Sequence, residues 1–188
     1  MELISEANVD KIVAWEGWRM ARRYRRFLNR GDFGFYVFNG DGEVVYCHWC
    51  TIRKDAQTLS CVHDPIEVGD AYLTHGHARE DFRSKGICTY VVAKNVEFLQ
   101  ERYRCQGVKR IRSSMAIQNI SCWKLFERLG FVRCQEFHSW RLLGHCFVRW
   151  TRDLLPGEGD GEKQSRSSIK FKVPEIWWDP VFDRVRQR

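Results

Sequence analysis

A short basic turn between an expected strand and an expected helix constrains this chain more than any other feature. The turn is Arg83-Ser84-Lys85-Gly86-Ile87-Cys88. Residues 69–78 before it have the pattern of a strand, and apolar residues at 88, 92, 96, 99 and 103 mark one face of a helix after it. Such a turn points free backbone N–H groups and the positive end of the helix dipole at one place. It is therefore suited to a diphosphate, and Gly86 lets the backbone approach closely.

A second segment, residues 119–131, begins with cap-type residues, continues as a short amphipathic helix and stops at Gly130. The two segments together resemble the GNAT superfamily of acetyl-CoA-dependent N-acyltransferases. The turn is similar to the family's Arg/Gln-x-x-Gly-x-Gly/Ala pyrophosphate element. The second segment is similar to its Asn-x-x-(Ala/Ser)-x-x-Leu-Tyr-Glu-Lys-Leu-Gly-Phe element. The resemblance covers roughly residues 35–150.

The order of expected elements gives an antiparallel front half and a βαβ back half. This order predicts the α/β class (α+β in the order of its elements), a central mixed β-sheet with helices on both faces. In the family the fourth and fifth strands splay apart, and the pantetheine arm enters the gap. We expect one GNAT acyltransferase domain over residues 1–153, a flexible linker over 154–168, and an apolar docking segment over 169–188. That segment should dock on its own domain, on a second copy in a homodimer, or on another protein.

The resemblance assigns the binding of acetyl-CoA, the acyl donor, to two groups of residues. The first comprises Ala78, Arg79, Arg83, Ser84, Lys85, Gly86, Ile87 and Cys88. The second comprises Asn119 and Ser121, for which simple helix capping is the structural alternative. In the family a backbone N–H of the fourth strand polarises the thioester carbonyl, which corresponds here to residues 76–79.

Any general base should project from the same strand, whose local candidates are Asp70, Tyr72, Thr74, His75 and His77. Of these, Tyr72, His75 and His77 are assigned to catalysis. Histidine has the most suitable unperturbed pKa for this work. In a regular strand, however, Tyr72 and Thr74 share the face that carries bases in relatives. His75 and His77 then face the opposite side unless a bulge at Gly76 shifts the register.

Two positions depart from the family pattern. Phe126 stands where the family often has a tyrosine that protonates the leaving thiolate, so protonation falls to Tyr72, Ser121 or water, or is unnecessary. Cys88 replaces a glycine or alanine beneath the diphosphate. No cysteine has a convincing basic partner in the sequence, so we expect direct attack by the amine without an acyl-enzyme.

The eight cysteines are scattered and suggest reduced thiols in a cytoplasmic protein. Cys47-His48-Trp49-Cys50 invites a zinc interpretation, but it lies in an expected strand without a second ligand pair, so no metal is expected. No apolar run is long enough to span a membrane. The net charge of +7 suits polyanionic ligands, coenzyme A among them. An arginine-rich helix over residues 9–29 is either an anion-binding stripe or a solvated face.

These observations predict an N-acetyltransferase that transfers acetyl from acetyl-CoA to the amine of a small molecule, with an amino sugar or nucleotide-linked amino sugar as the candidate acceptor. One alternative is an acyltransferase that docks an acyl carrier protein or a charged tRNA. The other is a non-catalytic domain that binds CoA or nucleic acid as a regulator. Retention of the full phosphate turn argues against a purely nucleic-acid role, and nucleic acid is not the partner that the sequence favours.

Overall fold

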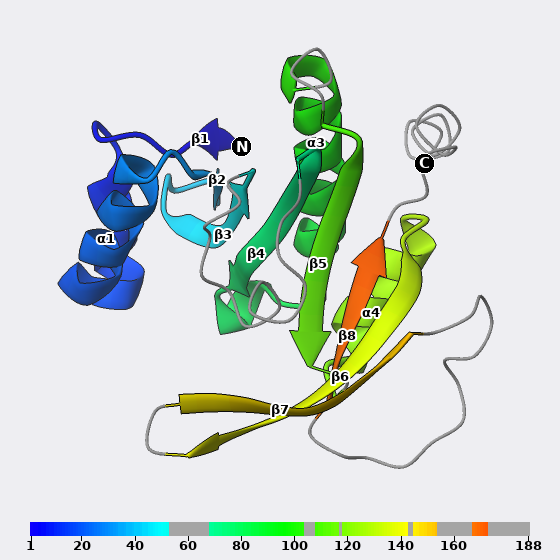
Figure 1. The fold of residues 1–188 in the computed structure, drawn as a ribbon. Coiled ribbons are helices and arrows are strands. Elements are labelled where there is room, and N and C mark those ends of the chain that lie inside the picture. The colour runs from blue at the N-terminus through cyan, green and yellow to red at the C-terminus, as the bar shows by residue number, and fades with distance from the viewer. Residues whose placement is uncertain (53–67, 104–107, 117, 143–144, 154–166, 173–188) are drawn as a thin grey trace.

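The architecture is seen in a computed structural model that describes residues 1–52, 68–103, 108–116, 118–142, 145–153 and 167–172 (Figure 1). The expected strand at residues 57–63 and the greater part of the expected linker lie outside these residues. In the part of the chain that is described, no helix is long and apolar enough to cross a membrane.

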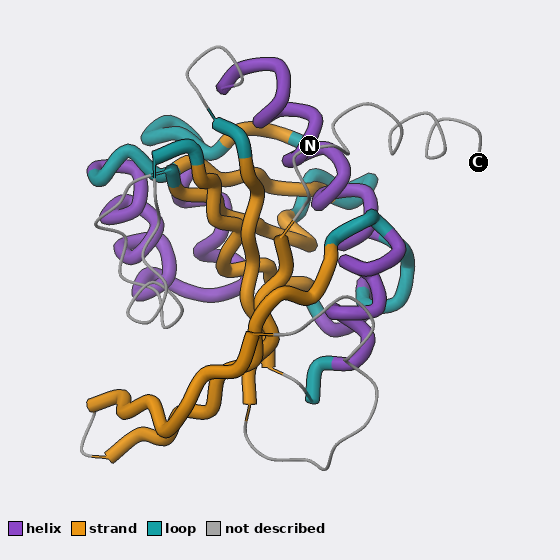
Figure 2. Tube along the Cα trace, turned by 45° about the vertical axis from the view of Figure 1, so that its right-hand side comes forward, coloured by secondary structure: helices purple, strands orange, loops and turns teal. Residues whose placement is uncertain are grey.

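A single eight-stranded mixed sheet forms the centre of the fold. Its strands are β1 (Glu2–Leu3), β2 (Phe33–Phe38), β3 (Val44–Thr51), β4 (Asp70–Ala78), β5 (Arg110–Ala116), β6 (Val132–Leu142), β7 (His145–Asp153) and β8 (Ser167–Lys172). Their order in the sheet is β1-β2-β3-β4-β5-β8-β6-β7. β4 and β5 pair in parallel, and the other neighbours pair antiparallel. The β6–β7 hairpin extends away from the body of the molecule (Figures 1 and 2).

Helices cover both faces of this sheet. They are η1 (Val9–Ile12), α1 (Val13–Asn29), η2 (Glu80–Phe82), α3 (Ile87–Tyr103) and α4 (Ile120–Arg128). On one face α1 packs through Tyr24 onto Tyr36, Cys47 and Trp49. On the other face α3 and α4 bury a cluster around Leu73. The predicted mixed sheet with helices on both faces is confirmed.

The parallel pair β4–β5 is closed at one end and open at the other. Pairing runs from Asp70 opposite Arg110 to Leu73 opposite Ser113, and β4 then continues unpaired with β5 as far as Ala78. At the closed end the buried Asp70 carboxylate forms ion pairs with Arg110 and Arg112 at 2.5 and 2.8 Å. Figure 1 shows the two strands drawing apart toward their C-terminal ends. The gap expected between the fourth and fifth strands is therefore present.

The C-terminal segment begins within the sheet, where β8 lies between β5 and β6. The sequence suggested three partners for residues 169–188: their own domain, a second copy, or another protein. Residues 169–172 pair with strands of their own domain. Strand pairing also starts at Ser167, inside the stretch predicted as linker, because the backbone there hydrogen-bonds to two neighbouring strands. Residues 173–188 lie outside the described part, and with them most of the predicted docking segment.

The expected first helix is interrupted near its start. Gly17 has φ 76° and ψ 174°, which is not a helical conformation, and the backbone therefore breaks between Glu16 and Trp18. A positive φ is readily available to glycine because it has no Cβ. The break turns Glu16 toward the C-terminal half of β4, where its carboxylate contacts His77.

Candidate active site

The turn between β4 and α3 presents its backbone to solvent. Ser84 has φ 61° and Gly86 has φ 77°, and residues 83–86 are all exposed. α3 begins at Ile87, and the first amides of a helix have no partner within it. A Cβ placed on Gly86 would meet no atom within 4 Å, so the space in front of this backbone is open. The arrangement fits a diphosphate, as the sequence predicts.

Arg83 and Lys85 line the same turn. The Arg83 guanidinium donates from Nε to the Ala78 carbonyl at 3.3 Å and pairs with Glu80 at 3.2 Å. The Lys85 ammonium lies 4.6 Å from the centre of the Phe82 ring. Both side chains are exposed, so these surface contacts can be exchanged for phosphate oxygens.

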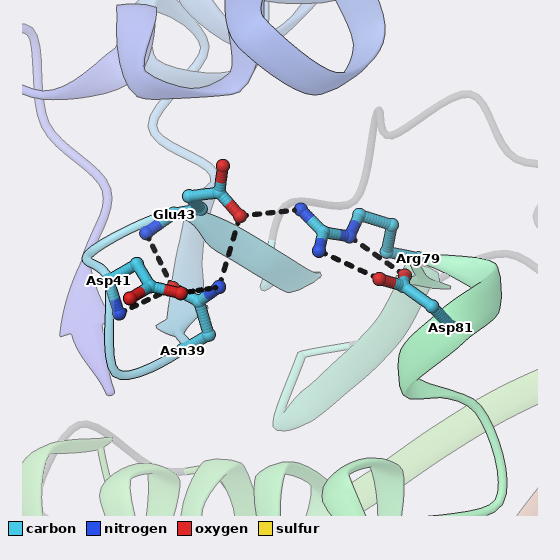
Figure 3. A network of polar contacts seen from close by, with 5 residues as sticks. All are labelled: Asn39, Asp41, Glu43, Arg79 and Asp81. Carbon is cyan, nitrogen blue, oxygen red and sulfur yellow. Dashed lines mark hydrogen bonds and ion pairs between the residues drawn. The ribbon is translucent and has the colours of Figure 1, made fainter.

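Arg79, predicted to bind the donor, contacts two carboxylates in the structure. Its guanidinium donates two bonds of 2.8 Å to Asp81 and one of 3.0 Å to Glu43, as Figure 3 shows. Asn39 joins Glu43 to the β2–β3 turn, so Arg79 ties the end of β4 to that hairpin. The guanidinium also holds the pKa of both carboxyls below their usual range. The Arg79 amide donates to the Val45 carbonyl at 2.9 Å, so this amide of the stretch 76–79 is already engaged with β3.

Asn119 and Ser121 lie at the same edge of the sheet as this turn, because β4 and β5 are parallel and each is followed by its helix. Asn119 is the N-cap of α4, and its Oδ1 accepts from the Cys122 amide at 3.4 Å. Ser121 is exposed on the first turn. Asn119 thus caps the helix, as the structural alternative predicts. Ser121 does not take part in this cap.

A bulge in β4 decides which way the two histidines point. Trp49 of β3 lies opposite Thr74 and Cys47 lies opposite His77, so His75 and Gly76 together face the single residue His48. His75 takes up the extra residue with φ 51°. Beyond the bulge the alternation is shifted by one, and His77 falls on the α1 face of the sheet with Thr74. From the sequence, the histidines reach the face that carries bases in relatives only if a bulge occurs near Gly76, and this bulge is present.

His77 forms a dyad with a carboxylate of α1. Its Nε2 lies 2.7 Å from the Glu16 carboxylate, and its ring stacks on Trp15 with centroids 5.0 Å apart and planes 11° apart. The carboxylate holds the proton on Nε2, so the lone pair of the neutral ring lies on Nδ1. The His77 side chain is 49% exposed, so a ligand can reach it. No pattern in the sequence selected Glu16 or Trp15.

His75 is held in the neutral state. Arg23 donates to its Nε2 at 2.6 Å, so the ring proton lies on Nδ1, which is 2.9 Å from Thr74 Oγ1. Burial, and next the Arg23 charge, lower the pKa of His75 to about 4. With both ring nitrogens engaged, His75 fits a positioning role better than proton transfer.

Tyr72 lies before the opening, where β4 still pairs with Arg112 of β5. Its side chain is 2% exposed. A base must contact the amine that it deprotonates, so the structure does not favour Tyr72 among the three candidates.

A hydroxyl that the sequence did not reveal lies behind Gly76 on the α3 face. A Cβ added to Gly76 would be 3.0 Å from Tyr46 Oη and 3.1 Å from the His48 ring, so both side chains reach over this glycine. Tyr46 Oη donates to Cys88 Sγ at 3.3 Å. Burial, and next the Cys88 thiol, raise the pKa of Tyr46 well above its usual value. Phe126, where the family has its tyrosine, is buried against Phe131.

The zinc interpretation of residues 47–50 fails on geometry. Cys47 faces α1 and contacts Tyr24, whereas His48 faces α3 and contacts Asn95. Neighbouring strand residues point to opposite faces, so they cannot share one ion. Within the described residues no cluster of three metal-ligating side chains occurs.

Comparisons with known proteins agree with this geometry. The family model described as "Acetyltransferase (GNAT) family" matches residues 2–131. A comparison with curated proteins found no match. Among solved structures, mutant forms of the spermidine/spermine N-acetyltransferase of Vibrio cholerae superpose with a TM-score of 0.60 at 11% identity, covering 97% of this chain and 96% of that one.

Two further structures have the same fold. The ribosomal-protein-S18-alanine N-acetyltransferase of Escherichia coli gives a TM-score of 0.59 at 12% identity, covering 92% of this chain and 91% of that one. The ribosomal-protein-S5-alanine acetyltransferase of Vibrio fischeri gives 0.60 at 13% identity, covering 95% and 94%. At such identities these likenesses concern the fold, whereas the family model spans more than half of the chain. The chain therefore belongs to the acetyltransferase (GNAT) family, as an N-acetyltransferase.

Proposed function

We propose that this protein transfers an acetyl group from acetyl-CoA to the amine of a small molecule by direct attack. The observation that carries the proposal is the position of the His77–Glu16 dyad. It sits on the open stretch of β4, between the end of β4–β5 pairing and the phosphate turn. The turn at residues 83–88 would hold the diphosphate of the donor, and the opening would admit its pantetheine arm.

His77 is the group we assign to proton removal. An amine is protonated at neutral pH and must lose a proton before it attacks the thioester. Nδ1 of His77 accepts that proton, and the Glu16 carboxylate stabilises the imidazolium that forms. The neutral amine nitrogen then bonds to the acetyl carbon and the carbon–sulfur bond breaks. The second proton that the nitrogen loses passes to the departing sulfur, directly or through water, so that CoA leaves as the thiol.

The buried thiols support direct attack over an acyl-enzyme. Burial raises the pKa of Cys47 and of Cys122 to about 12, and it also raises the pKa of Cys88 and Cys50. A thiol is nucleophilic only as the thiolate, so these groups are unreactive at neutral pH. For Cys88 burial outweighs its position at the start of a helix.

The test is release of free CoA when the purified protein is mixed with acetyl-CoA and a panel of amines. The panel contains amino sugars, nucleotide-linked amino sugars, polyamines and amino acids. We expect at least one amine to give a saturable rate that the His77→Gln variant loses. If acetyl-CoA binds but no amine raises CoA release above hydrolysis, the protein does not act on small amines. If acetyl-CoA does not bind, the donor assignment fails as well.

A further inference from the structure

Beyond the acetyl-transfer site, the exposed face of α1 is built almost entirely of arginine. From Trp18 to Arg30 the exposed residues are Trp18, Arg19, Arg22, Arg23, Arg26, Asn29 and Arg30. At ~100° per residue they fall within a contiguous arc of about 140°. We call this the arginine face. The remaining residues of this stretch are buried or half-buried, as a helix packed on one side requires.

Among the described residues, the arginine face has no acidic partner, unlike several other arginines of the fold. Arg25, which lies at the margin of the same arc and is half-buried, pairs with Asp10 and Glu6. In the described part of the chain none of the five arginines of the face forms an ion pair with a carboxylate; Arg23 contacts the neutral His75. No acidic residue occurs between Gly17 and Gly31. This face therefore carries a concentrated positive charge that attracts an anionic partner.

The shape of the arginine face matches a single nucleic-acid strand, a partner that the sequence alone did not favour. Arg19 and Arg30 are eleven residues apart, which is ~16 Å along a helix. A stacked strand carries one phosphate per ~3.4 Å, so about five phosphates fit beside five arginines. The Trp18 residue is 61% exposed at one end, next to the Gly17 break. An exposed indole stacks on a base, a contact that an acidic peptide does not offer.

We propose that the arginine face of α1 binds single-stranded RNA, with phosphates on the arginines and one base on Trp18. Arginine suits this task because its planar guanidinium binds phosphate oxygens through two hydrogen bonds. The bound strand would end at the Gly17 break, beside Glu16 and His77. The surface is distinct from the turn at residues 83–88, so the two sites can be tested separately.

The experiment measures binding of the full chain to a fluorescein-labelled single-stranded RNA 12-mer by anisotropy over a range of salt concentrations. The wild-type protein should show a slope of log K against log salt of about −3.5, because five phosphates are neutralised. Arg26→Gln and Arg22→Gln should each reduce the magnitude of the slope by about 0.7. Arg25→Gln is the matched control, since it removes the same charge from the same helix at an arginine that is already paired with Asp10 and Glu6, and it should leave the slope unchanged.

Trp18→Ala separates stacking from charge. It should weaken binding about tenfold at constant salt with an unchanged slope, because a base contact is lost while every phosphate contact stays. The proposal is overturned if Arg25→Gln lowers the slope as much as Arg26→Gln, which indicates a response to net charge alone. It is also overturned if Trp18→Ala binds normally and a poly-glutamate peptide competes as well as unlabelled RNA, since the partner is then an acidic protein.

Discussion

At the scale of single residues, the two histidines of β4 differ in what they can do. Burial, and next the Arg23 charge, lower the pKa of His75 and keep it neutral, and Arg23 occupies its Nε2. Glu16, in contrast, orients His77 and leaves the lone pair on Nδ1. The same side-chain type thus serves two purposes on one short stretch of strand. We assign proton removal to His77 and positioning to His75.

His77→Gln should lower kcat/KM by about a hundredfold or more, because general-base catalysis is lost. The loss should be greatest at low pH, where the unprotonated amine is scarcest. Glu16→Gln keeps a hydrogen-bond acceptor but removes the charge, so it should cost about tenfold. Steady-state rates across neutral and mildly alkaline pH measure both effects, with His75→Gln as the control. An unchanged pH–rate profile in His77→Gln contradicts the assignment and makes solvent water the base.

Tyr46 is the candidate that replaces the missing tyrosine at Phe126. The Tyr46 side chain is as buried as that of Tyr72, but its hydroxyl lies directly behind the exposed Gly76, so a sulfur placed against Gly76 can reach it. Its raised pKa keeps the phenol protonated, so it would donate a hydrogen bond to the leaving sulfur without losing its proton. Tyr46→Phe should lower kcat about tenfold with little change in the KM for acetyl-CoA. Tyr24→Phe is the matched control, because it removes another buried tyrosine–cysteine contact on the opposite face of the sheet. Equal kcat values in the two variants would exclude this role.

His48 links pH to stability. Burial, and next the neighbouring His75 ring, lower the pKa of His48 to about 4 from 6.5, so the unfolded chain binds a proton at a higher pH than the native protein. The contribution of neutral His48 to the free energy of unfolding is therefore complete above pH 6.5 and is lost as the pH falls toward 4. Between about pH 7.5 and about pH 5 this group should cost about 2 kcal/mol in the free energy of unfolding. Urea titrations at both pH values should show a fall that is smaller by about this amount in His48→Gln, and equal falls in both proteins would contradict it.

At the scale of elements, the sequence predicted what depends on local pattern. The turn at residues 83–88, α4 with its Asn119 cap, and the run of strands from β2 to β5 follow from periodicity and capping, and the structure contains them. The break at Gly17 could have been suspected from the sequence, because a glycine stands inside a helical pattern. The contact of Glu16 with His77 that results from the break has no such local signal. Glu16 meets His77 only after β4 has bulged and packed against α1, which is long-range information. Tyr46 could not be selected for the same reason, because its contacts with Gly76 and Cys88 join three elements.

Among the elements of the fold, the position of β8 in the sheet was the one least predictable from the sequence. A Gly- and Ser-rich stretch favoured a linker up to residue 168, yet β8 begins at Ser167 and completes the sheet between β5 and β6. Strand insertion depends on two partner strands that lie far earlier in the chain, and local composition does not encode such pairing.

Deleting residues 167–188 should therefore lower the melting temperature strongly and promote aggregation. The deletion removes a strand that pairs on both sides and leaves the edges of β5 and β6 unpaired. The control protein ends after Lys172 and keeps β8. Thermal unfolding followed by circular dichroism, with light scattering for aggregation, compares the two. If both truncated proteins melt alike, β8 does not contribute to the stability of the sheet.

At the scale of the whole molecule, the sheet brings two kinds of chemistry to one opening. The turn at residues 83–88 and the cap of α4 lie at the C-terminal edge of the parallel pair, and α1 contributes Glu16 from the other face. Donor and acceptor can therefore approach from different sides and meet at β4. The central claim is that the backbone of this turn binds the diphosphate of acetyl-CoA.

The most direct test is calorimetric titration of acetyl-CoA into the wild-type protein, Gly86→Asp and Gly86→Asn. Asparagine and aspartate have the same shape, both tolerate the positive φ of this position, and an added side chain meets open space. They differ in charge, and the added negative charge of aspartate repels phosphate groups that lie against this turn. We predict that Gly86→Asp nearly abolishes binding while Gly86→Asn retains measurable affinity. Equal affinities of the two variants, whether close to wild type or not, would contradict the claim that a diphosphate lies against this turn.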